Sequence, residues 1–355
     1  MRLAIDCRLS GKSGIGRYLD GIVEELVNRH PEHQYLLVCY NSHKKWPSKE
    51  NLDYIVTDIK PFSLKELFRF PVTEINQCDA YFSPYINIPF GIHVPIYSTI
   101  HDVIFLDIPK LTNSFGRAIR FYFLRRAYNM SRTVFTVSNF SKERIQYHLG
   151  NKRKIVIVYN GLSEGIRHFD TGNINKGDYL LFVGNIKKHK GLSILLNAFV
   201  KAKRKGLEGK LVLVGQAEKF RTSDAELSEA IQNIEDVEFT GYVENEQLCH
   251  LMADAKALVL PSLYEGFGIP PMEALYLGTK PIVSDLPVLK EIYGKLPVNF
   301  FKTGNSDDLA YQMLKVDPNY NIGCARTYID EHYNFKITAQ KILEEITETT
   351  CDETN

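Results

Sequence analysis

The chain has 355 residues and a formal net charge of +1, from 43 basic and 42 acidic side chains. A charge so close to zero gives no global field for nucleic acid, so we expect no nucleic-acid partner and only local anion sites. Hydrophobic residues make up 44% and charged residues 24% of the chain. This composition is typical of a folded globular protein, and the length leaves room for two domains.

Neither a targeting signal nor a paired-cysteine motif is recognisable in the sequence. The first stretch, MRLAIDCRLS, has no apolar signal core, and no apolar run approaches the roughly 18–20 residues of a membrane span. The six cysteines are scattered and form no CxxC pair, which favours reduced thiols and disfavours structural zinc. We therefore expect a cytoplasmic protein without a metal site.

Buried strands alternate with helices along the chain. The first half is predicted to contain a helix over 18–29 and strands over 2–6, 34–40, 95–100 and 133–138. The second half is predicted to contain strands over 179–184, 210–215 and 257–261, with helices from Leu192, over 246–255 and over 334–348. This alternation predicts two α/β domains, each with a parallel sheet covered by helices on both faces.

The segment 160–178 separates the two series of elements. It is rich in Gly, Asn and Asp and has no periodicity, so it is predicted to contain a linker. We expect an N-terminal domain at 1–165, a linker at 166–177, a C-terminal domain at 178–330 and a closing helix within 331–350. Ligands of parallel sheets bind beyond the carboxyl ends of the strands, so the loops after strands are the candidate sites.

Two glycines occupy the loop after the first strand. Gly14 and Gly16 would let the backbone approach a ligand and leave amides free at the start of a helix, which suits a phosphate. A dinucleotide fingerprint needs a third small residue where Leu19 stands, and no acid follows the next strand. A dehydrogenase is therefore disfavoured. An ordinary tight turn is the alternative interpretation.

A basic loop follows the strand at 179–184. Lys190 lies just before the helix that starts at Leu192. It adds a full positive charge to the positive end of the helix dipole, which suits a diphosphate leaving group. Lys187, Lys188 and His189 are adjacent, and a solvated basic turn is the alternative interpretation.

The stretch SLYEGFGIPPMEALYLG, residues 262–278, holds two acids, Glu265 and Glu273. The double proline fits the start of a helix and Gly278 fits its end, so we expect Glu273 in the first turn and Glu265 in the loop before it. Carboxylates beside the amides of residues 266–268 suit a polyol, whose hydroxyls donate to the acids. Capping acids or a glycosidase pair are alternatives. A metal clamp is disfavoured because the chain has no D-x-D sequence.

His101 and Asp102 directly follow the strand expected at 95–100. A histidine at the carboxyl end of a strand can hydrogen-bond a sugar hydroxyl or stabilise developing positive charge near the reacting carbon. A structural role for His101 and an N-cap role for Asp102 are the alternatives.

Several motifs occur together in one order, and with them the sequence resembles the family 4 (group 1) retaining glycosyltransferases of the GT-B fold. The resemblance covers essentially the whole chain, and the opening looks most like mannosyltransferases. The segments that carry it are AIDCRLSGKSGIGRY, STIHDVIF, VFTVSNFSKERI, IVYNGL, LLFVGNIKKHKGLSILLNAF, FTGYVENEQLCHLMADAKALVLPSLYEGFGIPPMEAL and PIVSD. It implies two Rossmann-like domains that face each other across a cleft, the first binding the acceptor and the second the nucleotide sugar. The closing helix then crosses back to the first domain.

The resemblance also implies a role for each candidate residue. Glu273 binds the ribose, Glu265 binds the transferred sugar, and Lys190 neutralises the diphosphate. The implied catalytic residues are His101, Lys190 and Glu265, and the implied donor-binding residues are Gly14, Gly16, Asn185, Lys190, Tyr242, Glu265, Gly266, Phe267, Gly268 and Glu273. The family often has a second basic residue in the Lys190 loop, either directly after the glycine or directly before the lysine. This chain departs from that pattern, with Asn185 and His189 at those two positions.

The implied reaction retains the anomeric configuration and needs neither a metal nor another cofactor. The acceptor hydroxyl attacks from the leaving-group face, with a phosphate oxygen as base and no side-chain nucleophile. We expect GDP-mannose as the donor, with UDP-glucose, UDP-N-acetylhexosamine and dTDP-rhamnose open, and a glycan or lipid-linked oligosaccharide acceptor in polysaccharide synthesis. Two other functions fit the fold, a sugar-nucleotide epimerase or hydrolase and a non-catalytic nucleotide-sugar-binding subunit.

The stretch 115–130 interleaves four arginines with aromatic residues. Such a mixture suits an anionic membrane surface near a lipid-linked acceptor, which would place the protein peripherally at the inner face of the membrane. The favoured interpretation is an ordinary helix with buried aromatic residues and arginines outside.

Overall fold

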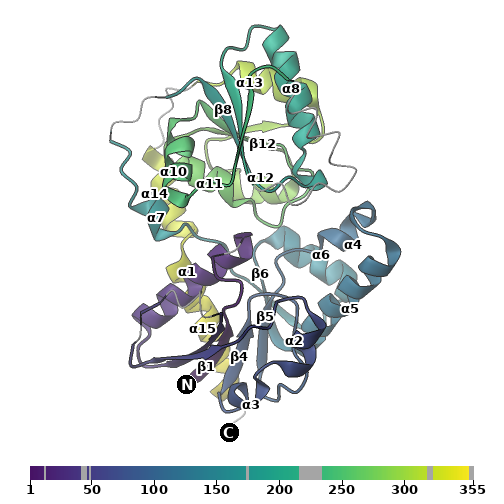
Figure 1. The fold of residues 1–355 in the computed structure, drawn as a ribbon, viewed down its shortest axis with the longest axis vertical. Coiled ribbons are helices and arrows are strands. Elements are labelled where there is room, and N and C mark those ends of the chain that lie inside the picture. Colours follow the sequence, from purple (N-terminus) through teal and green to yellow (C-terminus); the bar gives the residue numbers. More distant parts are fainter. Residues whose placement is uncertain are drawn as a thin grey trace. The chain divides into compact units, whose positions relative to one another are not determined.

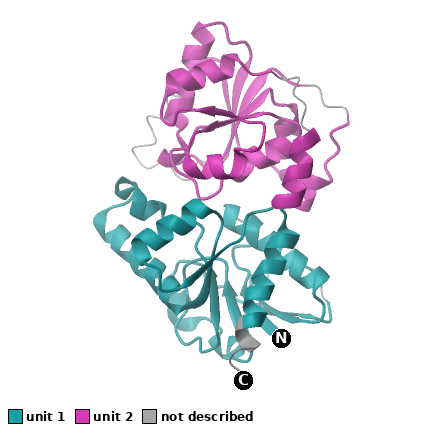
Figure 2. Ribbon diagram, turned by 180° about the vertical axis from the view of Figure 1, so that it is seen from behind, with its two compact units in different colours: residues 1–161, 333–355 teal, residues 162–332 magenta. Residues whose placement is uncertain are grey.

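The computed structural model describes residues 1–11, 13–40, 46–47, 49–172, 176–215, 234–317 and 323–351. The chain divides into two compact units, unit 1 with residues 1–161 and 333–355 and unit 2 with residues 162–332 (Figure 2). Each unit has its own parallel sheet, so the two parallel-sheet α/β domains predicted from the sequence are confirmed. None of the helices in the described ranges is long and apolar enough to cross a membrane.

Unit 1 contains a seven-stranded parallel sheet in the order β3-β2-β1-β4-β5-β6-β7 (Figure 1). Its strands are β1 (Arg2–Asp6), β2 (Gln34–Cys39), β3 (Leu52–Val56), β4 (Ala80–Ser83), β5 (Ile96–Thr99), β6 (Ser131–Thr136) and β7 (Lys154–Ile157). Its helices are α1 (Ser13–Arg29), α2 (Leu64–Arg69), α3 (Val72–Ile75), α4 (Ile104–Asp107), α5 (Ser114–Met130), α6 (Asn139–Leu149) and α15 (Phe335–Cys351).

Unit 2 contains a six-stranded parallel sheet in the order β10-β9-β8-β11-β12-β13. Its strands are β8 (Tyr179–Val183), β9 (Lys210–Val214), β10 (Val237–Gly241), β11 (Ala257–Leu260), β12 (Pro281–Ser284) and β13 (Asn299–Phe301). Its helices are α7 (Glu164–Arg167), α8 (Leu192–Arg204), α10 (Asn245–Asp254), α11 (Ile269–Tyr276), α12 (Pro287–Tyr293), α13 (Ser306–Leu314) and α14 (Gly323–His332).

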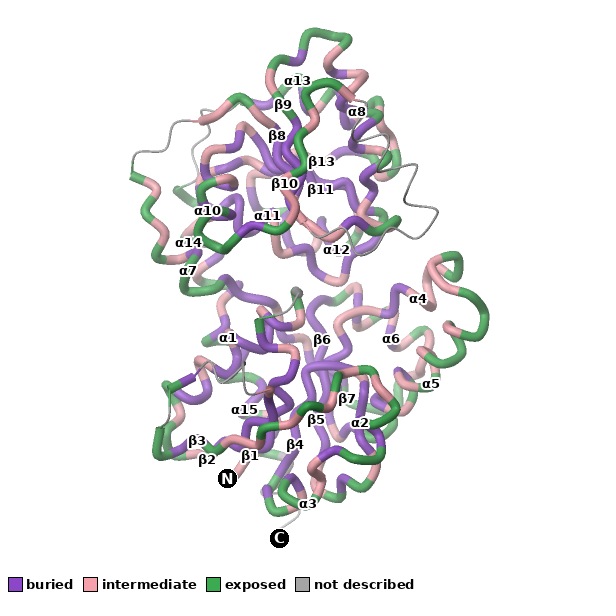
Figure 3. The backbone as a smooth tube through the Cα atoms, in the orientation of Figure 1, coloured by how far each residue is buried: buried purple, intermediate pink, exposed green. Residues whose placement is uncertain are grey.

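The central strands are buried along most of their length, as Figure 3 shows by colour. Both β4 and β11 are buried at every position, as expected for strands covered by helices on both faces. The strand order reverses between β1 and β4 in unit 1 and between β8 and β11 in unit 2. Such reversals leave a crevice at the carboxyl ends of the two strands, where ligands of open α/β sheets bind.

The C-terminal helix α15 is part of unit 1 and packs against α1. The contact is close because Gly21 of α1 has no side chain. A Cβ atom there would lie 2.1 Å from the ring of Phe335, so any larger residue would force the two helices apart.

Two local details differ from the sequence prediction. Helix α1 begins at Ser13 rather than at residue 18, so Gly14 and Gly16 lie in its first turn and not in a preceding loop. The short helix α7 occupies residues 164–167 of the segment 160–178 that was predicted to be irregular. A single turn of helix gives too short a pattern to show helical periodicity.

Candidate functional site

Lys190 and Glu265 meet at the switch point of the unit 2 sheet. Lys190 lies in the loop after β8, and Glu265 lies in the loop after β11. The Lys190 ammonium donates to both carboxylate oxygens of Glu265, at 2.7 Å and 3.0 Å. The side chains are 23% and 8% exposed, so the pair is partly open to solvent. An anion that reached this edge would meet a lysine whose charge is held in place by a single carboxylate.

The backbone fixes the two loops against each other. Gly191 has a φ of +69°, and a Cβ atom there would lie 2.0 Å from the carbonyl oxygen of Pro261. The amide of Leu263 also donates to the carbonyl of His189 at 2.7 Å. Gly191 is therefore required for the close approach that brings Lys190 to the β11 loop.

His189 adds no positive charge to this site near neutral pH. Burial and the neighbouring Lys190 ammonium lower the pKa of His189 to about 4. The position where the family often has a second basic residue therefore holds a neutral imidazole in this chain. Lys187 and Lys188 are both exposed, and no contact ties either of them to Glu265.

Glu273 lies on α11, but not where the sequence predicted it. The helix begins at Ile269, which makes Glu273 its fifth residue, beyond the first turn. The prediction was wrong because it took a proline as the first helical residue. The side chain of Glu273 is 3% exposed. Gly278, with a φ of +96°, follows the end of the helix as expected.

The Gly-Phe-Gly turn before α11 is closely packed. Phe267 is 4% exposed, so its ring belongs to the core of the loop. Gly268 caps the helix with a φ of +85°, and its Cβ position lies 2.8 Å from Leu289. The Tyr293 hydroxyl donates to the Gly268 carbonyl. The turn is thus a preformed backbone segment, with Gly266 partly exposed beside Glu265.

Two other predicted donor residues follow β8 and β10 of unit 2, two strands that are separated in the sheet by β9. Asn185 follows β8 and is partly buried. The loops after β8 and β9 approach closely there, because a Cβ atom on Gly215 would lie 2.0 Å from the Gly184 carbonyl. Tyr242 follows β10 and is 63% exposed. The structure gives Tyr242 no contact with Lys190 or Glu265.

His101 follows β5 in unit 1, and its ring has a defined orientation. Nε2 lies 2.9 Å from the carbonyl oxygen of Pro84, which follows β4. The ring of Tyr18 packs edge-on against His101, with centroids 4.9 Å apart. Burial lowers the pKa of His101 to about 4. The imidazole is therefore neutral at pH 7, with its proton on Nε2 and a lone pair on Nδ1 that can accept a hydrogen bond from a hydroxyl.

The two glycines in the first turn of α1 have different roles. A Cβ atom on Gly16 would lie 2.4 Å from the Leu9 carbonyl, so the first turn of α1 itself requires a glycine there. A Cβ atom on Gly14 would meet nothing within 4 Å, which leaves space beside the start of α1. Asp20 on α1 accepts from Ser10 Oγ at 2.6 Å and from the Gly11 amide at 3.0 Å, and so fixes the loop.

Sequence reasoning missed several residues that shape these sites. Ser262 donates to Glu265 at 2.6 Å, and Tyr18, whose hydroxyl lies 3.0 Å from Thr99 Oγ1, supports His101. Ser262 lies just after β11. It could have been predicted, because ligands of parallel sheets bind at the loops that follow the strands. The contact between Tyr18 and His101 could not be predicted, because the two residues lie 83 positions apart in the sequence.

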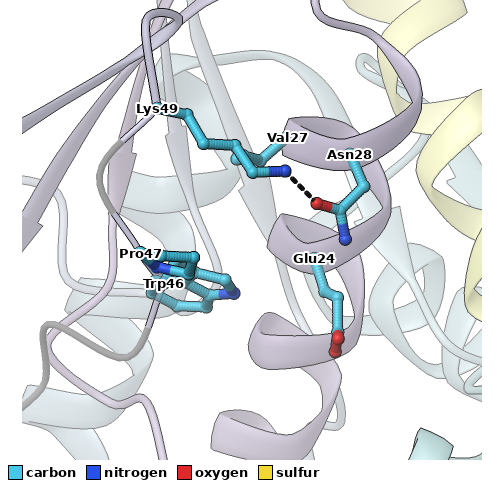
Figure 4. A pocket seen from close by; sticks show the side chains of 6 residues that line it. All are labelled: Glu24, Val27, Asn28, Trp46, Pro47 and Lys49. Atoms are coloured by element: carbon cyan, nitrogen blue, oxygen red, sulfur yellow. Dashed lines mark hydrogen bonds between the residues drawn. The ribbon is translucent and has the colours of Figure 1, made fainter.

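Two pockets of the structure lie away from these residues. One, of about 240 Å³, lies beside the second half of α1 in unit 1 and is lined by Glu24, Val27, Asn28, Trp46, Pro47 and Lys49 (Figure 4). Another, of about 580 Å³, is lined in part by Tyr179, Lys210 and Glu238 of β8, β9 and β10. We place the candidate site by strand topology and polar contacts, because neither pocket contains a predicted site residue.

Over the described ranges, the structure has no group of three or more His, Cys, Asp or Glu residues placed to hold a metal ion. Metal independence stays a prediction.

Two family models match the chain in succession. One, for glycosyltransferase family 4, covers residues 12–164, and the other, for glycosyl transferases group 1, covers residues 163–319. The second match contains Lys190, Glu265 and Glu273, and the first contains His101.

Curated relatives match parts of the chain. The O-antigen chain mannosyltransferase RfbU of Salmonella typhimurium is 32% identical over 209 residues, which is 57% of this chain and 56% of that protein. The GDP-mannose:cellobiosyl-diphosphopolyprenol alpha-mannosyltransferase of Xanthomonas campestris is 31% identical over 135 residues, 38% of this chain and 35% of that protein. The match therefore spans little more than half of the length of the first relative and about a third of the second.

The fold is shared with a solved glycosyltransferase-like structure over nearly the whole chain. Anabaena Alr3699/HepE, crystallised with UDP and glucose, matches with a TM-score of 0.73 at 16% identity, covering 98% of this chain and 100% of that chain. This likeness and the two parallel-sheet units show that the chain has the GT-B fold. The two family models, which together match residues 12–319, show that the chain belongs to the family 4 (group 1) glycosyltransferases.

Proposed function

We propose that this protein is a retaining, metal-independent glycosyltransferase that moves a hexose from a nucleoside diphosphate sugar to a glycan or lipid-linked oligosaccharide. The observation that carries the proposal is the Lys190–Glu265 pair at the switch point of the unit 2 sheet. A cation and a carboxylate side by side match the two polar parts of such a donor, its diphosphate and its sugar hydroxyls.

In unit 2, each site residue binds a different part of the donor. Lys190 releases Glu265 and binds the diphosphate, which stabilises the negative charge on the leaving group. Glu265, still held by Ser262, then accepts hydrogen bonds from the sugar hydroxyls. Glu273 binds the ribose, and backbone atoms near Tyr242 contact the base. This exchange of partners lets Lys190 pair with an anion both before and after donor binding.

On unit 1, His101 is the proposed contact of the transferred sugar. Its neutral Nδ1 accepts a hydrogen bond from a sugar hydroxyl, so His101 positions the sugar and does not supply a positive charge. The acceptor hydroxyl attacks the sugar carbon from the side that the diphosphate leaves, and a phosphate oxygen takes its proton. No side-chain nucleophile takes part.

GDP-mannose is the proposed donor. Support comes from the two mannosyltransferases among the relatives, one of which is described as using GDP-mannose. Those names describe other proteins and parts of this chain, so the donor is a proposal to be tested against UDP- and dTDP-sugars. An O-antigen or a related surface polysaccharide is the proposed product.

The proposed location is the cytoplasmic face of a membrane, with peripheral contact. No disulfide joins the described cysteines Cys7, Cys39, Cys78, Cys249 and Cys324, which supports a reducing compartment. Helix α5 exposes Phe115, Ile119 and Tyr122 next to arginines, which supports a contact with anionic lipid.

A screen of donors tests the proposal. Thermal shifts are measured with GDP-mannose, UDP-glucose, UDP-N-acetylglucosamine and dTDP-rhamnose, and the stabilising donor is then incubated with glycan and lipid-linked acceptors. The proposal expects one donor to stabilise the protein and to yield a product with the anomeric configuration of the donor. Epimerised or hydrolysed donor as the main product in the presence of acceptor would favour the epimerase or hydrolase, and binding without turnover would favour a non-catalytic subunit.

A further inference from the structure

Residues 60–69 of unit 1, which include α2, have a polar inner face and an apolar outer face. On the inner face Glu66 and Leu67 are buried. On the outer face Phe62, Leu64 and Phe68 are 62%, 76% and 74% exposed. Single exposed apolar side chains are ordinary on protein surfaces, but three within one short segment form a patch that calls for an explanation.

A buried cluster of charges anchors the inner face. Glu66 accepts hydrogen bonds from Arg8, from the Tyr85 hydroxyl and from Asn87. Arg8 also donates to Asp6 at 2.6 Å, and the side chains of Arg8, Asp6 and Glu66 are 0% exposed. The segment cannot turn its apolar face inward without breaking this cluster, which would leave buried charges unpaired.

Phe62 combines an unusual backbone conformation with a largely exposed side chain, one edge of which packs against Tyr85 with ring centroids 5.2 Å apart. Phe62 has a φ of +62°, in the left-handed region that residues other than glycine seldom adopt. Its amide donates to Glu66 Oε2 at 2.9 Å, which holds this conformation in place. The structure thus accepts backbone strain to keep an aromatic residue at the surface, an arrangement typical of functional sites.

The charges around the patch are basic. Lys60, Lys65 and Arg69 are exposed, and the segment's only acid is the buried Glu66. The nearest exposed acids along the chain are Asp58 and Glu74, one on each side of the segment. Lysines interleaved with apolar side chains are unusual in protein interfaces, whose cores are depleted of lysine. The same mixture is typical of segments that bind anionic lipid.

The patch continues onto α5. The ring of Phe90 lies 5.2 Å from the ring of Phe68, and the guanidinium of Arg126 on α5 lies over the same Phe90 ring at 4.1 Å. Both helices are labelled in Figure 1, and their exposed positions are coloured in Figure 3. Helix α5 contains no acid. Its exposed residues with apolar or basic side chains include Phe115, Arg117, Ile119, Tyr122 and Arg125.

We propose that residues 60–69 insert into the surface of an anionic bilayer, with α5 as a second contact on the same side. The apolar side chains enter the boundary between headgroups and acyl chains, and Lys60, Lys65 and Arg69 pair with lipid phosphates. The inference rests on the proposed function in one respect: the membrane contact would bring the protein to a lipid-linked acceptor. Its test needs neither donor nor acceptor, so its failure would leave sugar transfer untouched.

Vesicle sedimentation of the full chain tests the insertion. The lipids are phosphatidylcholine alone and phosphatidylcholine mixed with phosphatidylglycerol. The variants are L64S/F68S, which removes two apolar side chains, and K65S/R69S, which removes two charges. Tyr147→Ser on α6 is the matched control, because Tyr147 is also an aromatic residue of unit 1 and is 74% exposed. Melting temperatures confirm that each variant is folded.

The wild type and Tyr147→Ser are expected to sediment with the anionic vesicles and much less with the neutral ones. L64S/F68S should lower the partition coefficient roughly tenfold or more. K65S/R69S should lower it by about fivefold for each charge removed, on the anionic vesicles only. Unchanged sedimentation of L64S/F68S would overturn the proposal. A wild type that sediments with neither kind of vesicle would also overturn it. If light scattering then showed a dimer that L64S/F68S abolishes, the patch would be assigned to a protein interface.

Discussion

The charged groups at the carboxyl edges of the two sheets differ in their access to solvent. In unit 1, Arg8 pairs with Asp6 and Glu66, and all three side chains are 0% exposed. In unit 2, Lys190 pairs with Glu265, and the two side chains are 23% and 8% exposed. Both clusters lie beside a switch point of strand order, yet only the second leaves its cation accessible.

The difference separates an architectural cluster from a ligand site. A fully buried ion pair gives little net stability compared with apolar packing, but removing one partner is costly, because the other charge stays buried. Such a cluster fixes the positions of the segments that supply its members. A partly exposed pair can exchange one partner for a ligand without burying a lone charge. We therefore expect changes at Arg8 to act on stability and changes at Lys190 to act on catalysis.

The largest effect is expected from Arg8→Ala. It would leave Asp6 and Glu66 buried without their cation and lower the free energy of unfolding by about 3–5 kcal/mol. Arg2→Ala is the matched control, because Arg2, at the start of β1, pairs with Asp53 at the surface. Its loss should cost less than about 1 kcal/mol. Urea unfolding measures both. Equal losses would remove the distinction between the buried and the exposed pair.

Lys190→Ala is expected to act on turnover. Loss of one charged donor at the leaving group should slow transfer by about 10²- to 10³-fold at saturating donor. Lys187→Ala, three residues away and exposed, should change the rate less than about threefold. Single-turnover kinetics with the identified donor measures both rates. If the two variants were equally active, Lys190 would be no more than part of a solvated turn.

Glu273→Ala is expected to weaken nucleotide binding rather than turnover. A lost carboxylate contact to the ribose costs about 1.5–3 kcal/mol, which is roughly 10- to 100-fold in Kd. Calorimetric titration with the nucleoside diphosphate measures the change, and Glu291→Ala on α12 is a control on a neighbouring helix. An unchanged Kd with a lowered kcat would assign Glu273 to the chemical step.

The smallest effect is expected from pH. The pKa of His101 is lowered from about 6.5 to about 4 by burial, so the unfolded chain binds a proton that the folded chain excludes. The contribution of His101 to stability is complete above pH 6.5 and is lost as the pH falls towards 4. We expect the wild type to lose about 1–2 kcal/mol more than His101→Asn between pH 7 and pH 5. Parallel stability curves for the two proteins would contradict a neutral His101.

The strands and their loops were predictable because buried parallel strands are short, continuous apolar runs. The prediction of a strand at 2–6 matches β1, and the prediction of a helix from Leu192 matches α8. The start of α1 was missed because it depends on the fit of Gly16 against the Leu9 carbonyl. That contact depends on how the loop folds back onto the helix, whereas glycine at this spacing in the sequence indicates a turn.

The residues of the candidate site could be predicted from the sequence, but the contacts between them could not. Lys190 and Glu265 were both singled out by their positions after strands, whereas their direct bond depends on β8 and β11 being neighbours in the sheet. The same limit applies to Arg8 and Glu66, which lie 58 residues apart. A sequence pattern does not reveal which strands pair, so it does not reveal which charges meet.

A crystal structure with a bound nucleoside diphosphate sugar tests the central claim most directly. The account predicts that the Lys190 ammonium leaves Glu265 and lies within hydrogen-bonding distance of a diphosphate oxygen, while Glu265 accepts from a sugar hydroxyl. A bound donor whose diphosphate lies elsewhere, with Lys190 still bonded only to Glu265, would contradict it.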